Sequence, residues 1–222
     1  MKLAIFDIDG TLVEGSTERR FWRYLVRRGR FGPRQLLEYC WFWLRFCSVY
    51  GADTSKKNKA YLVRLAVADI DSLASEFVTA EILPRLYAPA VARLQQHLRH
   101  GDTVALISGT LEPIARALAA ALGVQHVRAT VCRQRDGMYL ASPPEVHPFA
   151  AAKLALALEL AAQLRADLRQ ASAYGDSRHD LALLEAVGNP VAVRPDGPLL
   201  ARARGNRWDI IASRDEPEAL PQ

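Results

Sequence analysis

Short apolar runs along the chain end abruptly at polar residues, and they predict buried strands. The runs cover residues 3–6, 103–107, 171–174 and 190–193, of which the last two are weaker. Continuous apolar runs of about four to eight residues are typical of strands that are buried on both faces of a parallel sheet. We therefore expect a sheet that contains these four strands.

Helical patterns separate the predicted strands. Residues 113–122 are rich in Ala and Leu, begin at a proline and are followed by a glycine, which are common signals at the two ends of a helix. We also expect a long helix over residues 149–169 and a shorter one over residues 179–187. Strands that alternate with helices predict a Rossmann-like open α/β sheet, mainly parallel and flanked by helices.

Other segments depart from this alternation. Within residues 128–140, two short runs meet at an Asp-Gly pair, which favours a hairpin turn. Residues 14–88 contain no clear strand-like run, so we predict that they form an all-helical cap inserted after the first strand. The expected core domain consists of residues 1–13 and 89–222. The polar tail over residues 213–222 is expected to fray.

The composition is that of an ordinary folded protein. The 222 residues include 29 Lys and Arg and 24 Asp and Glu, so the net charge is +5, and half of the residues are apolar. These values exclude a disordered or collagen-like chain. The small positive charge permits anionic partners. It does not indicate a nucleic-acid partner, because no recognition fold accompanies it.

The cysteines and the length of the apolar runs indicate the cellular setting. Cys40, Cys47 and Cys132 are an odd number without C-x-x-C spacing, so neither a disulfide framework nor a thiolate zinc site is expected. No apolar run approaches the roughly 20 residues of a membrane span, and the N-terminal run is too short for a secretion signal. We therefore expect a cytoplasmic protein without a transmembrane segment.

The first strand is followed by two acids in the sequence Asp7-Ile8-Asp9-Gly10-Thr11. Ligands of open α/β sheets bind outside the carboxyl ends of the strands, and residues two apart on a strand face the same side. Two close carboxylates resist joint ionisation unless a cation offsets their charge. A hard cation such as Mg²⁺ prefers oxygen ligands. The pattern therefore predicts a nucleophile and an acid/base at a metal site.

Three further motifs follow in the order that this chemistry requires, although each is a weak signal alone. Ser108-Gly109-Thr110 follows the second strand and offers a hydroxyl and backbone N–H groups to an anion. Lys153 stands near the start of the long predicted helix and could neutralise a phosphate. Asp176 and Asp180 follow the third strand, where two acids can complete a Mg²⁺ site.

Together, these four motifs resemble those of the haloacid dehalogenase superfamily, and within it the phosphoserine-phosphatase-like branch. The resemblance extends over residues 7–180 and includes a helical cap after the first strand. It implies a Mg²⁺-dependent phosphatase that hydrolyses a small phosphomonoester through an aspartyl-phosphate intermediate. An acid at position 9 favours phosphate chemistry, because the dehalogenases of the superfamily need no acid for a leaving group.

The resemblance also implies a role for each motif residue. Asp7 would take the phosphoryl group, and Asp9 would protonate the leaving oxygen and then activate water. Lys153 would hold the charges together. The residues implied as ligands of Mg²⁺ are Asp7, Asp9 through its backbone carbonyl, Asp176 and Asp180. Those implied in phosphate binding are Gly10, Thr11, Ser108 and Gly109.

Two departures leave the substrate open. Phosphoserine phosphatases carry a glutamate nine positions after the nucleophile, where this chain has Ser16 between Glu14 and Glu18. They also usually carry an asparagine where this chain has His179, which we expect to be a surface side chain on a helix, with contact to the substrate as the alternative. Two other functions stay open. One is a phosphotransferase on the same fold, and the other is a non-catalytic binding or scaffold protein that uses the cap.

The cap contains an unusually aromatic segment at residues 39–46. A helix that is apolar nearly all round must bury more than one face. We expect this segment to form the core of the cap and its contact with the main domain. A homodimer contact, an apolar substrate pocket or a membrane-surface patch are the alternatives. The arginines that precede it, between residues 19 and 34, predict a solvated helix face or one that attracts anions.

Overall fold

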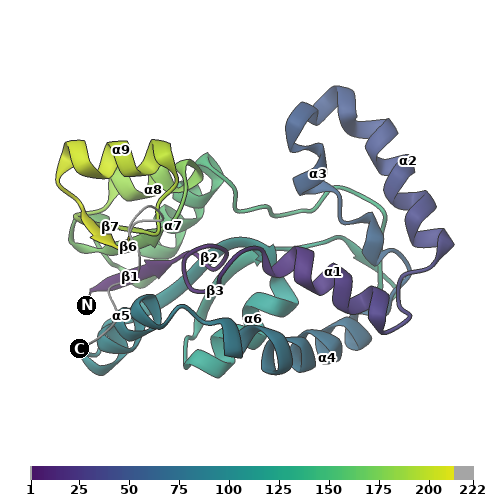
Figure 1. The fold of residues 1–222 in the computed structure, drawn as a ribbon, viewed down its shortest axis with the longest axis horizontal. Helices are drawn as coiled ribbons and strands as arrows, with labels where there is room; N and C mark the ends of the chain where they lie inside the picture. Colours follow the sequence, from purple (N-terminus) through teal and green to yellow (C-terminus); the bar gives the residue numbers. More distant parts are fainter. Residues whose placement is uncertain (1, 213–222) are drawn as a thin grey trace.

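A six-stranded parallel sheet forms the centre of the molecule (Figure 1). The computed structural model describes residues 2–212. The strands lie in the order β3-β2-β1-β6-β7-β8, and each neighbouring pair is parallel. Their bounds are β1 (Leu3–Phe6), β2 (Thr103–Leu111), β3 (His126–Thr130), β6 (Ser172–Gly175), β7 (Asn189–Val193) and β8 (Asp209–Ile211).

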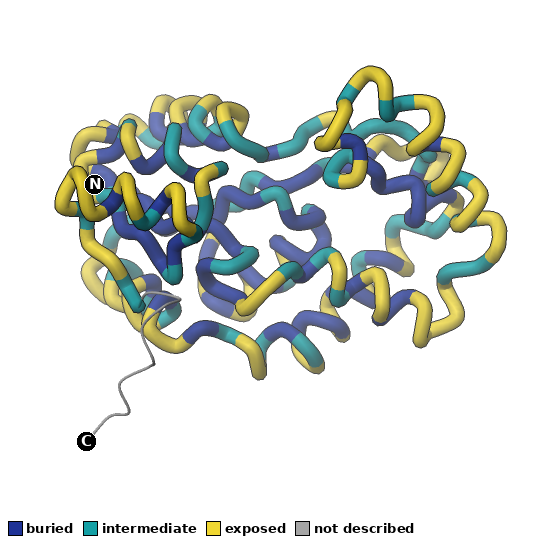
Figure 2. Tube along the Cα trace, turned by 45° about the horizontal axis from the view of Figure 1, so that its top comes forward, coloured by how far each residue is buried: buried dark blue, intermediate teal, exposed yellow. Residues whose placement is uncertain are grey.

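Helices cover both faces of the sheet. One face packs against α5 (Ala88–Arg99) and α6 (Glu112–Leu122). The other packs against α7 (Ala151–Leu164), α8 (Leu181–Ala186) and α9 (Gly197–Asn206). Alternate residues of β1 therefore enter different clusters: Ala4 and Phe6 one, and Leu3 and Ile5 the other. This double burial explains why the strand is an unbroken apolar run. Figure 2 shows the buried trace in the interior and exposed residues around it.

The segment between β1 and α5 is made of helices and turns. Its α-helices are α1 (Thr17–Arg27), α2 (Pro33–Tyr50), α3 (Thr54–Lys57) and α4 (Val67–Phe77). Short helical turns cover Gly51–Asp53, Ala60–Leu62, Val78–Ile82 and Leu83–Arg85. The buried side chains of α4 belong to the same hydrophobic cluster as α6 and the sheet. The division into a core and a cap at residues 13 and 89 stays a prediction.

Most of the expected elements are present. The four expected strands correspond to β1, β2, β6 and β7, and the helix expected at 113–122 is α6. The expected hairpin is formed by β4 (Gln134–Arg135) and β5 (Met138–Tyr139), which are antiparallel. Both turn residues, Asp136 and Gly137, have positive φ angles, as a tight hairpin turn requires.

Several boundaries were wrong. The helix expected over 149–169 ends at Leu164, because Arg165 adopts a left-handed conformation and Asp167 then caps a separate turn. The helix expected over 179–187 is α8, which follows a short turn. The edge strands β3 and β8 were missed, because polar residues interrupt the apolar residues of β3 and β8 is only 3 residues long. Residues 128–130 thus belong to β3 rather than to the hairpin. The tail at 213–222 lies outside the described residues.

Within residues 2–212, no helix is both long enough and apolar enough to cross a bilayer.

Replacing Phe77 by Ala tests the packing of α4 against α1. Phe77 is fully buried, and its ring centroid lies 5.1 Å from that of Phe21 and 5.4 Å from that of Tyr24. The cavity that Phe77→Ala leaves should lower the free energy of unfolding by about 3–5 kcal/mol, measured by urea denaturation. The control Val26→Ala, on the exposed side of α1, should change it by under about 0.5 kcal/mol. A similar small loss for both variants would contradict this packing.

Candidate active site

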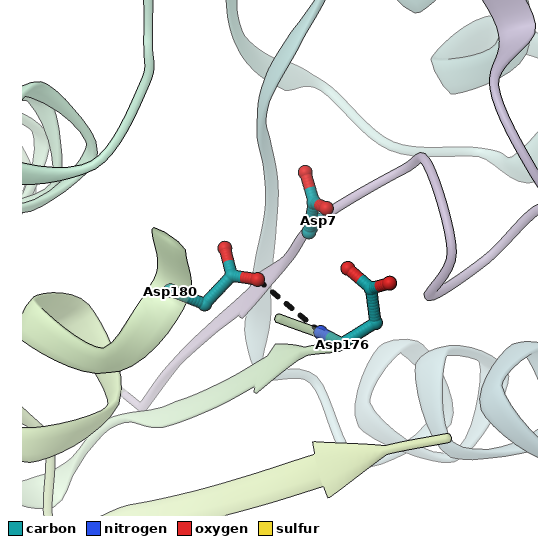
Figure 3. A group of neighbouring side chains, drawn as sticks. All are labelled: Asp7, Asp176 and Asp180. Carbon is teal, nitrogen blue, oxygen red and sulfur yellow. Dashed lines mark hydrogen bonds between the residues drawn. The ribbon is translucent and has the colours of Figure 1, made fainter. Parts of the chain in front are cut away.

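Three buried carboxylates meet where β1 and β6 end (Figure 3). Asp7 follows β1 and Asp176 follows β6, and the two strands are parallel neighbours, with Phe6 opposite Tyr174. Asp180 lies in the turn after Asp176. One carboxylate oxygen of each acid lies within 4.8 Å of the others. The sequence-based expectation that these acids gather at one edge of the sheet agrees with this geometry, because parallel strands end on the same side.

Lys153 enters this group from the first turn of α7. Its Nζ lies 2.8 Å from Asp7 Oδ1 and 2.5 Å from Asp180 Oδ1. Burial lowers the pKa of Lys153, but the carboxylates of Asp180 and Asp7 together raise it by more, so the pKa lies above its ordinary value. The lysine is therefore a permanent cation inside the acidic group.

The acidic group still carries more negative than positive charge. Burial raises the pKa of Asp7 to about 6, against the lowering effect of Lys153. Asp180 Oδ2 accepts hydrogen bonds from the backbone N–H groups of Asp176 and Ser177, both at 3.2 Å. The three buried acids offer oxygen ligands. Because only one lysine lies among them, the site keeps an excess of negative charge. These residues fit a hard divalent cation such as Mg²⁺.

Glycines allow the acids to approach the backbone so closely. Gly10 has a φ of +83°, and a Cβ placed there would lie 2.0 Å from Asp176 Oδ2. At Gly175, a Cβ would lie 2.6 Å from the Cβ of Asp180. Any other residue at either position would displace a carboxylate of the group. Next to Gly10, Thr11 is fully buried, and its hydroxyl has no hydrogen-bond partner among residues 2–212.

Ser108 and Gly109 lie within β2 rather than after it. The strand was expected to stop at residue 107, but it continues to Leu111 with an irregular register between Ile107 and Leu111. Ser108 therefore occupies a bulge-like part of the strand, and its hydroxyl donates to Thr110 Oγ1 at 3.2 Å. Ser108 and Gly109 nevertheless line the same cavity as Asp7.

Asp9 is held apart from the three acids. Its Oδ1 accepts a hydrogen bond of 2.9 Å from the backbone N–H of Thr17, in the first turn of α1. Asp9 does not belong to the cluster that the carboxylates of Asp7, Asp176 and Asp180 form. Burial raises the pKa of Asp9, although the hydrogen bonds from Thr17 lower it. A raised pKa favours the protonated form that a general acid needs.

A cavity of ≈ 990 Å³ joins these residues to the helical segment above them. Lys153, Asp176 and Ser108 lie on its sheet side, together with Asp7 and Asp9. On its other side, α1 and α2 supply Glu18, Arg19, Trp22, Arg23, Leu36 and Tyr39. The sequence predicted that an inserted helical segment accompanies the site, and the lining of this cavity shows which of its helices face the acids.

His147 lines the cavity, and the sequence analysis missed it. Thr130 Oγ1 donates to the backbone oxygen of Gly109 at 2.6 Å, so the contact of 3.1 Å between Thr130 Oγ1 and His147 Nδ1 requires the imidazole to donate. His147 Nε2 then presents a lone pair, and it is buried without a partner within residues 2–212. Burial lowers the pKa of His147 to about 4, so the ring is neutral at pH 7. A single histidine in a loop forms no sequence pattern from which its place in the cavity could have been predicted.

The cap side of the cavity contains a buried ion pair. Lys59 is almost fully buried, and its Nζ donates to Glu18 Oε1 at 2.6 Å, while the Tyr61 hydroxyl donates to the same oxygen at 2.8 Å. Ser16 caps α1, since its hydroxyl accepts a hydrogen bond from the backbone N–H of Arg19. Of the two glutamates on either side of Ser16, Glu18 is the one that lines the cavity.

His179 was expected at the surface, and this expectation was wrong. The side chain is half-buried and lines the cavity, and its ring centroid lies 4.2 Å from that of Phe149. The short turn before α8 directs the residue toward the site, whereas the expected surface helix would have directed it toward solvent.

Comparisons with known proteins identify the family. A model of the haloacid dehalogenase-like hydrolase family matches residues 4–185, and the chain belongs to this family. The phosphoserine phosphatase SerB1 of Mycobacterium tuberculosis is 29% identical over 93% of this chain and 69% of its own length. A histidinol-phosphatase of Neisseria meningitidis is 26% identical over 94% of this chain and 97% of its own.

Solved structures agree with this assignment. A Bordetella pertussis protein of unknown function is 28% identical, with a TM-score of 0.81 over 95% of this chain and 98% of that chain. The apo form of a phosphoserine phosphatase has the same fold, with 18% identity and a TM-score of 0.64 over 97% of this chain and 94% of that chain. The expected superfamily is therefore confirmed by the family model, and the expected fold by the solved structures.

Replacing Gly10 by Ala tests the close approach of Asp176. The new Cβ would displace the Asp176 carboxylate, so Gly10→Ala should weaken Mg²⁺ binding by about 10–100-fold, measured by isothermal titration calorimetry. Gly15→Ala is the matched control. Gly15 has a similar φ of +75°, but its nearest contact is the side chain of Arg20 at 3.9 Å. Equal effects of the two variants would show that backbone strain alone is responsible.

Proposed function

We propose that the protein is a Mg²⁺-dependent phosphatase that hydrolyses a small phosphomonoester through an aspartyl phosphate on Asp7. The main support is the position of the Asp7 carboxylate. It is buried against the ammonium of Lys153, yet it lines a cavity that also contains Asp9, Ser108 and Gly109. A candidate nucleophile, a candidate acid and hydrogen-bond donors thus line one cavity.

The proposed reaction has two steps. A carboxylate oxygen of Asp7 attacks phosphorus, the bond to the ester oxygen breaks, and Asp9 transfers its proton to the departing alcohol. Water then attacks the phosphorus of the aspartyl phosphate while Asp9 takes a proton from it, and phosphate leaves. Asp9 is suited to both steps, because Thr17 holds one of its oxygens and burial raises its pKa.

The remaining motif residues bind and offset charge in this proposal. Lys153 stays close to Asp7 throughout and neutralises part of the phosphoryl charge. The hydroxyl of Ser108 and the backbone of Gly109, together with Gly10 and Thr11, bind the phosphoryl oxygens. The unpartnered Thr11 hydroxyl is available for this role.

Magnesium would be held by the carboxylates of Asp7 and Asp176 and the backbone carbonyl of Asp9, with Asp180 in support. When bound, it supplies positive charge that offsets the phosphoryl oxygens and the acids. Burial raises the pKa of Asp7 to about 6, and the positive charge of a bound ion would favour the ionised, nucleophilic carboxylate further.

The substrate is a small phosphorylated compound in this proposal, and the polar groups that line the cavity indicate which further groups it carries. The relatives include proteins named phosphoserine phosphatase and histidinol-phosphatase, so phosphoserine and histidinol phosphate are both candidates. Glu18 is already paired with Lys59, whereas His147 Nε2 offers a free acceptor. We therefore propose a phosphomonoester that carries a hydrogen-bond donor beyond its phosphate.

We also propose a cytoplasmic location. Cys40, Cys47 and Cys132 are all free thiols, as suits a reducing compartment.

Replacing Asp7 by Asn removes the nucleophile. Phosphate release from a panel of phosphomonoesters with Mg²⁺ should fall by about 10³-fold or more, and EDTA should abolish release by the wild type. The matched control is Asp136→Asn, an exposed acid in the hairpin turn, which should keep full activity. Retained activity in Asp7→Asn would refute the proposal, as would transfer to added alcohols in place of release to water.

Replacing Asp9 by Asn separates the two steps. With an alkyl phosphate, formation of the aspartyl phosphate should slow by about 10²–10⁴-fold, because the alkoxide leaves without a proton. With p-nitrophenyl phosphate, whose leaving group needs no acid, formation should slow much less. Hydrolysis of the intermediate should slow equally for both substrates. Quench-flow measurements of the labelled enzyme distinguish the steps, and an equal effect on formation with both esters would contradict the role of Asp9.

A further inference from the structure

Helix α2 exposes an apolar face to solvent. We define the α2 apolar face as Leu36, Leu37, Trp41, Trp43 and Leu44. Leu37 is 70% exposed, Leu44 64% and Trp41 62%. The expectation that this segment is a cap core holds only for the opposite side of the helix, where Phe42 is buried. A contiguous apolar surface of this kind on a folded protein indicates an interaction site.

The spacing of these residues makes the face continuous. Leu37, Trp41 and Leu44 are separated by four and three residues, so they lie along one side of the helix. Leu36 and Trp43 extend the same surface sideways. Figure 1 shows α2 at the outer edge of the molecule, and no described element covers this side. The helix therefore has two apolar sides, of which the rest of residues 2–212 covers one.

Unpaired cations surround the α2 apolar face. Arg34 and Arg45 lie on α2 itself and are exposed, and neither forms an ion pair with another described residue. On α1, Arg19 and Arg23 line the cavity and are likewise without an acidic partner within residues 2–212.

Other arginines of the same basic run do find partners. Arg27 pairs with Glu81, Arg28 with Glu76 and Arg30 with Asp69. The cations on the side of α4 are thus neutralised by acids of the chain, and those near the α2 apolar face are left for an anionic partner.

We propose that the α2 apolar face docks on an anionic lipid bilayer, with α2 lying in the plane of the headgroups. An interfacial helix combines Trp and Leu on one face with basic residues beside them, and α2 has both features. Tryptophan favours the headgroup region of a bilayer, and arginine near an anionic surface adds attraction.

A second copy of the chain fits this face less well. A symmetric dimer through α2 would place the same face of each copy in contact, and it would bring Arg34 and Arg45 of one copy close to those of the other. Glu38 is the one acid in the sequence of α2 and offsets only one of its two arginines, so each copy would bring a positively charged helix to the contact. An anionic bilayer has the opposite charge and meets no such repulsion.

Docking would also bring the active-site cavity close to the bilayer. Leu36 belongs both to the α2 apolar face and to the lining of the cavity, and Trp22 lines the cavity beside it. The part of the cavity lining that Leu36 and Trp22 form would therefore lie close to the headgroup region.

The test measures binding to vesicles by co-sedimentation. The wild type should bind vesicles of equimolar phosphatidylcholine and phosphatidylglycerol, and bind phosphatidylcholine alone more weakly. The double variant Leu37→Glu/Trp41→Glu should bind these vesicles at least about tenfold more weakly than the wild type. Arg34→Gln/Arg45→Gln should lose much of the preference for anionic vesicles, and added salt should have the same effect. The matched control is Leu158→Glu, a 54% exposed leucine on α7, which should bind like the wild type.

Three outcomes would overturn the proposal. The first is a wild type that does not bind anionic vesicles. The second is a wild-type dimer that Leu37→Glu/Trp41→Glu converts to a monomer, which would show that a second copy covers the face. The third is an equal loss of binding in Leu158→Glu. Phosphate release from a water-soluble ester should be unchanged in all the variants, so a failure of docking is distinguishable from a failure of the proposed catalysis.

Discussion

The position of one ammonium group makes the acidic centre of this protein feasible. Lys153 Nζ lies 2.8 Å from Asp7 and 2.5 Å from Asp180, and Asp176 completes a cluster within 4.8 Å. Buried carboxylates this close repel one another and resist ionisation. The lysine offsets one of the charges and leaves an excess that a divalent cation can balance. Lys153 is thus a fixed cation of the structure, and the acids around it are suited to hold an exchangeable metal ion.

The scaffold brings these groups together through the sheet order. Because β1 and β6 are neighbours, Asp7 and Asp176 emerge side by side, and the start of α7 places Lys153 against both Asp7 and Asp180. Glycines at positions 10 and 175 remove the side chains that would otherwise occupy the space of Asp176 and Asp180. The short apolar strands, the glycines and the acids therefore form one arrangement, in which the loss of any part would move the others.

The helices between β1 and α5 contribute side chains and backbone groups to the candidate site as well as covering it. The first turn of α1 holds Asp9 through the backbone N–H of Thr17, and α1 and α2 supply the far side of the cavity. Glu18 and Lys59 form a buried pair there, which fixes how the turn after α3 packs over the site. On its outer side, α2 exposes tryptophan and leucine between unpaired arginines, a surface that the catalytic geometry does not need.

The sequence alone determined the elements whose signals are local. Apolar runs of β1 and β2 predicted the sheet, and the acids that follow the first and third predicted strands indicated a metal site, because residues after parallel strands share one edge. Tertiary structure alone decided what depends on distant contacts. The edge strands β3 and β8, the neutral form of His147, the pairing of Glu18 with Lys59, the direction of His179 and the exposed side of α2 all follow from packing between segments far apart in the chain. A local pattern records how a segment can be buried, but only the assembled fold shows which neighbour covers it.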